Sequence, residues 1–393
     1  MDSLQQGEFL ILDGATGSNL MAAGLPAGVC VETWIAEHKE ILQQLQQDFV
    51  KAGSRVVLAS TFGANPQKLS SYGLEPQTAS LNQQLYAISV DGVGETAVVA
   101  GDVSPSGLFL APMGDAAFTD LINLYDTQIT ALKEAGAQLV VIETQMTMAD
   151  ARAALICAKK HGLTAFVTIT VESGGRTLTG MSLPAAVVTL QAMGADAVGL
   201  NCSCGPVSMA DLLKQAVPYA NVPLIAKPNA GEPGNPLSAE AFGKAAAGLA
   251  DCGATILGGC CGTTPEHIAC LVKELQGKTP QIAESTEEYL SDERQVYSLP
   301  QNPVTETFAV TEDLMDDLMD VEPDTDLVIL TLQNTEDAHH LTNALSVCRV
   351  PLCFESHNTD ALRVALELYQ GRAAVMGNGV TQELIKTYGC LSL

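Results

Sequence analysis

The stretch 139–162, "LVVIETQMTMADARAALICAKKHG", contains the unit from which the fold can be inferred. It opens with four apolar residues rich in β-branched side chains, which is typical of a short buried strand, and this run ends at Glu143. The following "MADARAALICAKKHG" has a helical pattern and stops at a glycine, a common helix end. Another apolar run, Ala165–Ile169, comes next. The stretch therefore predicts a strand, a crossover helix and a second, parallel strand.

The same unit recurs along the chain before an acidic stretch begins at Glu284. The apolar runs are Phe9–Leu12, Ser54–Leu58, Ala97–Gly101, Leu139–Ile142, Ala165–Ile169, Ala197–Leu200, Pro223–Ala226 and Thr255–Leu257. Helical patterns such as "LQQLQQDFVKAG" and "LINLYDTQITALKEAGA" fall between them. Eight strand–helix units match the (β/α)8 barrel, or TIM barrel, whose typical size is about 250 residues. We predict such an α/β barrel over residues 1–282.

The remaining residues are divided by their composition. Residues 283–305 are predicted to form an acidic linker, and carboxylates crowd the chain from Glu284 to Asp326. This acidity favours a solvated linker and helix face, and a docking surface for a partner is the alternative. Residues 306–393 contain apolar runs at Leu327–Leu332, Leu352–Phe354 and Ala373–Met376. They are too few for a second barrel and predict a small open α/β sheet packed by helices.

The composition limits the function classes. The chain has 393 residues, and its formal net charge of −26 repels phosphate backbones and anionic lipids, so charge-driven binding to nucleic acid or membrane is not expected. No apolar run reaches membrane-spanning length, and "MDSLQQGEFLILDGATGS" lacks an export signal, which predicts a cytoplasmic protein. Its 11 cysteines are then mostly reduced, and are core residues or metal ligands rather than a disulfide framework.

Polar residues follow the predicted strands, where a barrel of this type gathers its active site. In chain order they are Asp13, Thr61, Asp102, Glu143, Glu172, Asn201, Cys202, Lys227, Asn229, Cys260 and Cys261.

Three of these residues are cysteines whose positions suggest a metal site. Cys260 and Cys261 are adjacent, which rarely allows a disulfide and fits no zinc-finger spacing. Strands six and eight lie close together on a closed ring, so Cys202 can reach this pair. Three thiolates on zinc leave one position open for a substrate sulfur, which describes a catalytic site. Cys204 would close that position and is interpreted as a nearby thiol. The other seven cysteines are predicted to be packing residues.

Taken together, these residues resemble the homocysteine S-methyltransferase family, and most closely the homocysteine-binding module that opens cobalamin-dependent methionine synthase. The resemblance covers about the first 290 residues. It rests on "DGATGS" (13–18), "TFGAN" (61–65), "GDVSPSG" (101–107), "ET" (143–144), "GRTLTG" (175–180), "GLNCSCGP" (199–206), "KPNAG" (227–231) and "GGCCGTTPEHI" (258–268).

The resemblance implies roles for the site residues. The three cysteines would bind zinc, Asp13 and the Gly14 backbone would receive the amino acid end of homocysteine, and Glu143 would help to hold its ammonium group. Physical chemistry agrees, because carboxylates neutralise an ammonium and backbone amides in glycine-rich turns receive a carboxylate. Thr61 and Asn229 complete the predicted substrate-binding set.

The chain also departs from the family pattern. Ser60 stands where Asn is frequent, Cys204 where an apolar residue is more usual, and Asp102 and Ser104 where Ser and Gly are expected.

The resemblance implies a zinc-dependent methyltransferase that makes methionine from homocysteine. The methyl group would come from methylcobalamin on a separate corrinoid protein. The segment "VPLCFESHNTDALRVALELYQGRAAVMGNGVTQELIKTYGC" is similar to part of a pterin-binding barrel, here truncated. Three alternatives stay open: a small-molecule donor such as S-methylmethionine or a betaine-like compound, another thiol acceptor, and a thiol-binding or corrinoid-associated accessory protein without turnover.

Overall fold

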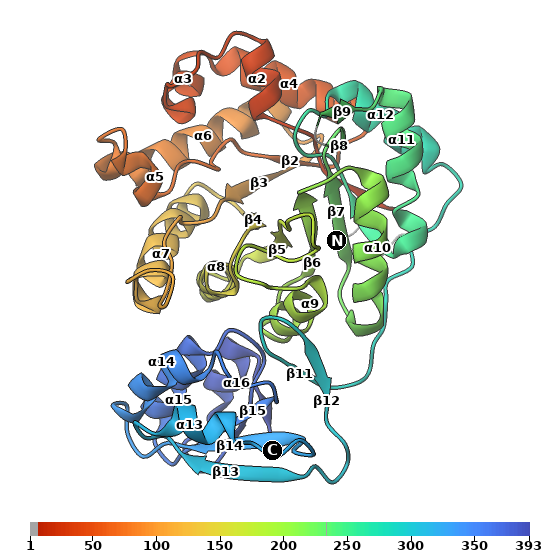
Figure 1. Ribbon diagram of the computed structural model, residues 1–393. Coiled ribbons are helices and arrows are strands. Elements are labelled where there is room, and N and C mark those ends of the chain that lie inside the picture. Colours follow the sequence, from red (N-terminus) through yellow and green to blue (C-terminus); the bar gives the residue numbers. More distant parts are fainter. Residues whose placement is uncertain (1–6, 233) are drawn as a thin grey trace.

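The computed structural model describes residues 7–232 and 234–393, and shows two α/β domains, one above the other (Figure 1). The first six residues of the predicted barrel segment lie outside the described residues.

The larger domain is a ring of eight parallel strands, as predicted. In the described residues the sheet order is β1-β10-β7-β6-β5-β4-β3-β2. A parallel bridge between Leu12 and Val56 joins the two end strands, so the sheet is closed almost completely. The strands are β1 (Leu10–Ile11), β2 (Val56–Leu58), β3 (Val98–Val103), β4 (Leu139–Gln145), β5 (Thr164–Ile169), β6 (Ala197–Cys202), β7 (Leu224–Pro228) and β10 (Ala254–Leu257). Each overlaps one predicted apolar run, which confirms the barrel.

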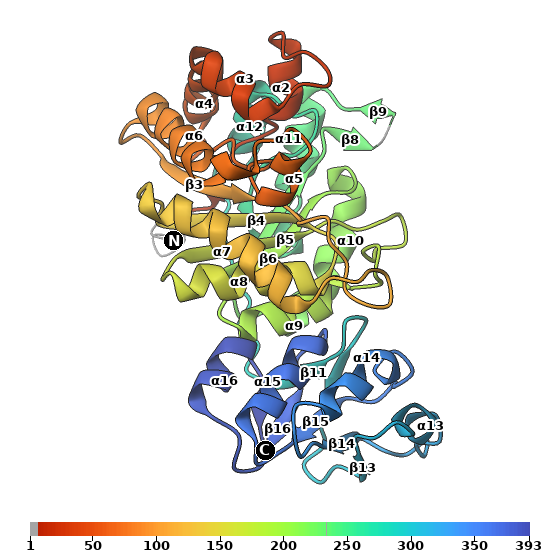
Figure 2. The same ribbon diagram turned by 90° about the vertical axis from the view of Figure 1, so that its left-hand side faces the viewer.

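Helices surround the ring on its outer side (Figures 1 and 2). The main ones are α4 (Lys39–Ala52), α6 (Thr78–Val93), α7 (Phe118–Glu134), α8 (Met148–Lys160), α9 (Leu183–Ala192), α10 (Pro206–Ala216), α11 (Ala239–Ala247) and α12 (Pro265–Glu274). Shorter elements are α2 (Gly17–Ala22), α3 (Val31–Glu37), α5 (Pro66–Ser70) and a hairpin of β8 (Gly231–Glu232) and β9 (Asn235–Pro236). Within the described part of the chain, no helix combines the length and apolar character needed to cross a membrane.

The barrel core has two layers because strand side chains alternate between faces. In β4, Leu139 and Val141 belong to the cluster that fills the ring, together with Phe166. Val140 and Ile142 face outward and pack in the larger cluster between sheet and helices. This arrangement leaves the strand ends, rather than the ring centre, for polar side chains.

The smaller domain is a parallel sheet of five strands in sequential order. Its elements are β13 (Thr305–Ala309), α13 (Leu314–Met319), β14 (Leu327–Thr331), α14 (Leu341–Ala344), β15 (Leu352–Glu355), α15 (Thr359–Leu368), β16 (Ala374–Met376), α16 (Gln382–Tyr388) and β17 (Leu391–Ser392). The three central strands confirm the predicted runs, and β13 and β17 are edge strands that were not predicted. The likeness to a pterin-binding barrel stays a prediction.

The segment 283–305 contains more structure than an acidic linker. It forms an antiparallel hairpin of β11 (Tyr289–Ser291) and β12 (Val296–Ser298), which lies beside both domains (Figure 1). The buried Ser291 hydroxyl is hydrogen-bonded to Thr189 of α9 at 2.8 Å, and the Ser291 amide donates to the carbonyl of Arg372 in the smaller domain at 3.0 Å. The hairpin therefore helps to fix the two domains against each other.

A buried arginine makes a second connection between the domains. Arg152 projects from α8, and its side chain is fully buried. Its guanidinium donates to the carbonyls of Leu366 and Tyr369 at 2.6 Å each, at the carboxyl end of α15. The positive charge also opposes the negative end of the helix dipole. Burial lowers the pKa of Arg152 to about 10.

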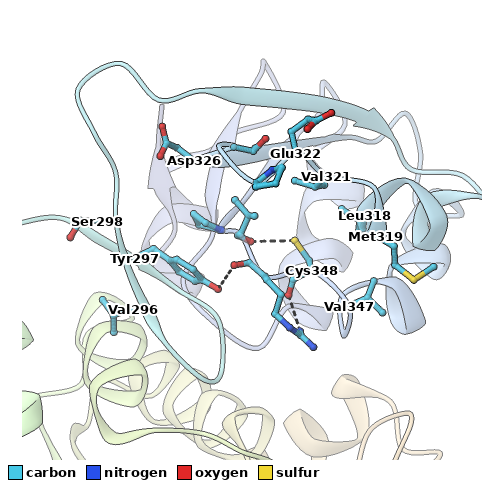
Figure 3. Close-up of a pocket in the computed structure, with 15 residues that line it drawn as sticks. Val296, Tyr297, Ser298, Leu318, Met319, Val321, Glu322, Asp326, Val347 and Cys348 are labelled. Carbon is cyan, nitrogen blue, oxygen red and sulfur yellow. Dashed lines mark hydrogen bonds between the residues drawn. The ribbon is translucent and has the colours of Figure 1, made fainter.

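Two cavities lie away from the barrel mouth. One, of about 710 Å³, is bounded by β12, the end of α13 and residues 347–351 (Figure 3). In it the Tyr297 hydroxyl donates to the Arg349 carbonyl, and the Cys348 thiol donates to the Val350 carbonyl, each at 3.3 Å. The other, of about 600 Å³, lies between residues 109–119 of the barrel and helices α14 and α15. No predicted site residue lines either cavity.

Candidate metal centre and substrate pocket

The fold brings the three predicted cysteines together at the barrel mouth. Cys202 is the last residue of β6, and Cys260 and Cys261 lie in the loop after β10. Their sulfur atoms all lie within 4.8 Å of one another, and those of Cys202 and Cys261 are 3.8 Å apart. Among the described residues this is the one group of three or more His, Cys, Asp or Glu side chains close enough to share a metal ion.

The loop that carries Cys260 and Cys261 is held by backbone hydrogen bonds to neighbouring strands. The Gly259 amide donates to the Asp13 carbonyl at 2.9 Å, and the Cys260 amide donates to the Pro228 carbonyl at 2.8 Å. A Cβ atom on Gly259 would lie 2.4 Å from Thr263 Oγ1, so only glycine fits there. The adjacent cysteines are therefore oriented by the ends of β1 and β7.

Strained backbone is concentrated at this mouth. Among the described non-glycine residues, positive φ angles occur at Thr144 (64°), Cys202 (58°) and Ser203 (65°). Such conformations cost on the order of 1–3 kcal/mol each and persist only where the surroundings impose them. The Ser203 hydroxyl accepts a hydrogen bond from the Val171 amide at 2.7 Å, which holds this turn. The strain aims the Cys202 sulfur at the other two.

Hydrogen bonds couple the three sulfurs. Hydrogen bonds from Cys260 and Cys261 lower the pKa of Cys202 to about 3, and Asn229 also donates to its sulfur. The same bonds to Cys202 raise the pKa of both Cys260 and Cys261. A cation bound by all three sulfurs would displace thiol protons.

A charged cluster lies at neighbouring strand ends. The Lys227 ammonium donates to Glu143, and both side chains are almost fully buried. Burial disfavours the Lys227 charge, but Glu143 and Asp13 outweigh burial and raise the pKa of Lys227. Burial also raises the pKa of Glu143, raises that of Asp13 to about 7, and raises that of Asp102 well above its usual value. One lysine does not neutralise three carboxyl groups.

Three buried acceptor oxygens in this region have no hydrogen-bond partner among the described residues. They belong to Asp13 (Oδ1), Asp102 (Oδ1) and Asn229 (Oδ1). The second Asp13 oxygen accepts from the Leu58 amide at 2.8 Å. Unpaired buried acceptors cost stability, so this group of oxygens is suited to a ligand that supplies several donors.

Thr61 and Gly14 are both in close contact with neighbouring residues of the barrel mouth. The Thr61 hydroxyl donates to the Asp102 carbonyl at 2.8 Å and accepts from the Asp102 amide at 2.9 Å. A Cβ atom on Gly14 would lie 2.6 Å from Thr263 Oγ1, so the chain approaches Thr263 too closely for any side chain.

Cys204 stays outside the sulfur cluster, and burial raises its pKa to about 11. Five of the seven cysteines predicted as packing residues lie in hydrophobic clusters, namely Cys30, Cys157, Cys348, Cys353 and Cys390.

The sequence pattern placed Lys227, Asp102 and Asn201 at strand ends but assigned them no role. Their positions at strand ends were the only sign in the sequence that they belong to the site. Their hydrogen-bond and ion-pair partners depend on strand register, which the sequence does not show.

The chain is similar to known proteins over its barrel. The family model described as homocysteine S-methyltransferase matches residues 10–275. Methionine synthase of Mycobacterium tuberculosis is 29% identical over 294 residues, which is 68% of this chain and 24% of that protein. Methionine synthase of Mycobacterium leprae is 29% identical over 285 residues, or 66% of this chain and 24% of that protein. The chain therefore matches about a quarter of the length of these curated relatives.

Solved structures share the barrel. The homocysteine methyltransferase MmuM from Escherichia coli in its metallated form superimposes with a TM-score of 0.60 at 24% identity, over 69% of this chain and 97% of that one. Its oxidised form gives a TM-score of 0.58 at 23% identity, over 69% and 98% of the two chains. At this identity the likeness establishes the fold.

Proposed function

The chain belongs to the homocysteine S-methyltransferase family, and we propose that it methylates the sulfur of homocysteine to give methionine, with zinc held by Cys202, Cys260 and Cys261. The observation that carries this proposal is the convergence of these three sulfurs from β6 and from the loop after β10. Members of this family are S-methyltransferases.

The sulfur geometry fits zinc. A Zn–S bond of about 2.3 Å in a tetrahedral site puts neighbouring sulfurs about 3.8 Å apart. The Cys202 and Cys261 sulfurs are separated by 3.8 Å. Three protein thiolates leave one position open, as in catalytic rather than structural zinc sites. Zinc would hold the substrate sulfur as a thiolate, whereas a free thiol is only about 3% ionised at pH 7.

The charged pocket suits the amino acid end of homocysteine. Asp13, Asp102 and Asn229 each offer an unpaired acceptor oxygen, and an ammonium group has three donors. Its positive charge would offset the excess of carboxylates beside Lys227. We assign the Gly14 backbone to the substrate carboxylate, because glycine-rich turns present amides to anions. Thr61 would contribute to substrate binding indirectly, because its hydroxyl is hydrogen-bonded to the backbone of Asp102.

Glu143 takes part in ammonium binding through its charge. Its carboxylate is already paired with Lys227, so it contributes to the field around the ammonium. Methyl transfer then needs a sulfur held in line with the donor carbon, and binding both ends of homocysteine provides that alignment. The bond between sulfur and the methyl carbon would form as the bond between that carbon and the donor breaks. The electron pair of the broken bond would leave with the donor, and the thiol proton would already have been released when the sulfur binds the metal.

We propose methylcobalamin on a separate corrinoid protein as the methyl donor. The support is the similarity to methionine synthases, of which this chain matches only a part. We also propose a cytoplasmic location, because all 11 cysteines are free and the three ligand thiols must stay reduced.

The test is an anaerobic assay of zinc-loaded protein with homocysteine and free methylcobalamin, with S-methylmethionine as a parallel donor. Methionine formed from methylcobalamin and lost in Cys260→Ser supports the proposal. If methionine formed with S-methylmethionine but not with methylcobalamin, the proposed corrinoid donor would be wrong and a small-molecule donor would take its place. Zinc binding without turnover on either donor would refute the catalytic role.

A further inference from the structure

Asn201 is a buried amide whose four hydrogen-bonding positions are all used. It lies in β6 directly before Cys202, and none of its surface is exposed. Its Oδ1 accepts from the Thr144 amide and from the Thr168 hydroxyl, both at 2.8 Å. Its Nδ2 donates to the Thr144 hydroxyl at 2.8 Å and to the Cys260 sulfur at 3.7 Å. One side chain thus connects β4, β5 and the loop after β10.

The contact with Cys260 acts on a proposed metal ligand. An N–H donor beside a thiolate withdraws electron density from the sulfur and fixes its direction.

The contact with Thr144 acts on the substrate pocket. Thr144 has a φ of 64°, which is unusual for a β-branched residue. Asn201 binds both its amide and its hydroxyl, which holds this conformation. Since Glu143 is the preceding residue, the direction of its carboxylate toward Lys227 depends on the same turn.

We propose that Asn201 is a positioning residue that sets the direction and electron density of the Cys260 sulfur and, through Thr144, the placement of Glu143. The inference rests on the proposed metal site. The Asn201 side chain would thus connect the three cysteines with the turn that carries Glu143.

A purely structural role for a buried amide predicts loss of stability alone. Asn82 of α6 provides the matched control, because it is also fully buried and donates to the carbonyls of Ala64 and Thr78 at 2.7 and 2.8 Å. Asn201→Ala and Asn82→Ala remove the same atoms, and only the first removes a donor to sulfur.

The experiment titrates each apo variant with Co²⁺ and records the sulfur-to-cobalt charge-transfer absorption, followed by kcat and KM of the zinc-loaded forms. In Asn201→Ala we expect the band at longer wavelength, Co²⁺ affinity about 10- to 100-fold weaker, and a fall in kcat that exceeds the change in KM. Asn82→Ala should keep the wild-type band and affinity.

If Asn201→Ala folds poorly, a second variant provides a folded protein for the same measurement. In Asn201→Ala/Thr144→Gly, glycine adopts the left-handed conformation freely, which should restore stability while the shifted band persists. An unchanged band and affinity in a folded Asn201 variant would overturn the inference alone. Failure of the wild-type protein to bind Co²⁺ would overturn the proposed metal site as well.

Discussion

Replacing Arg152 with methionine tests whether one buried guanidinium holds the two domains together. Methionine keeps much of the volume and removes the charge and all donors. The carbonyls of Leu366 and Tyr369, now bonded at 2.6 Å, would lose their partner. The Phe118 ring, whose centroid is 5.4 Å from the guanidinium carbon, would lose a cation–π contact.

The expected cost follows from these contacts. Hydrogen bonds to a charged group contribute about 1.5–3 kcal/mol each, so two of them amount to about 3–6 kcal/mol. Removing the charge also relieves its burial cost, which offsets part of this loss. We therefore expect Arg152→Met to lower the free energy of unfolding by about 3 kcal/mol.

The assay is guanidinium unfolding followed by circular dichroism, with Arg363→Met as control. Arg363 lies on α15, and its ion pairs with Glu367 and Asp360 are partly exposed. Exposed pairs contribute about 0–1 kcal/mol, so this variant should stay near the wild type. Equal unfolding midpoints for the two variants would refute the buried connection.

Three further predictions concern the barrel mouth. Cys260→Ser should lose zinc by metal analysis while Cys204→Ser retains it, and zinc retained by the first would exclude Cys260 as a ligand. Since burial raises the pKa of Asp13 to about 7, the carboxyl is increasingly protonated below that pH, and homocysteine affinity measured by calorimetry should weaken from pH 8 to pH 6. Asp13→Asn should bind homocysteine more weakly, keep its metal and lack this part of the pH dependence. If its pH profile matched that of the wild type, Asp13 would not be a substrate-binding residue. Gly259→Ala should lower stability by about 1–3 kcal/mol in thermal melts, because the added Cβ would lie 2.4 Å from Thr263 Oγ1, and an unchanged melting temperature would contradict this close approach.

The barrel was predictable because its strands are buried on both faces. Continuous apolar runs such as that beginning at Leu139 mark such strands whatever their neighbours, and the residues that follow them must gather at one end of the ring. The edge strands β13 and β17 were missed for the opposite reason, since β13 alternates exposed and half-buried residues and β17 has 2 residues. The hairpin at 289–298 derives its order from contacts with Thr189 and Arg372, which only the folded chain provides.

The details of the site could not be inferred from the sequence because they depend on register and backbone conformation. Strand-end position identified Glu143 and Lys227 but not their pairing, which requires β4 and β7 to end at the same height. Thr144 and Cys202 both have positive φ angles, and a sequence usually signals this conformation by a glycine, which is absent at these positions. The conformation of Thr144 is held by a partner distant in sequence, the Asn201 side chain.

The barrel mouth contains two groups of acidic side chains, the three cysteines and the carboxyl groups of Asp13, Asp102 and Glu143. In each group, basic side chains of the chain do not balance the potential negative charge. Cys202, Cys260 and Cys261 lie together, and the Lys227 charge, which favours the Cys260 thiolate, is already engaged by Glu143. Asp13 and Asp102 share the Lys227 charge with Glu143, and burial raises the pKa of both aspartates, which reflects the cost of ionising them there. We expect a divalent metal at the sulfurs and an ammonium at the carboxylates to compensate this excess of negative groups, and their binding would then be coupled to the release of protons.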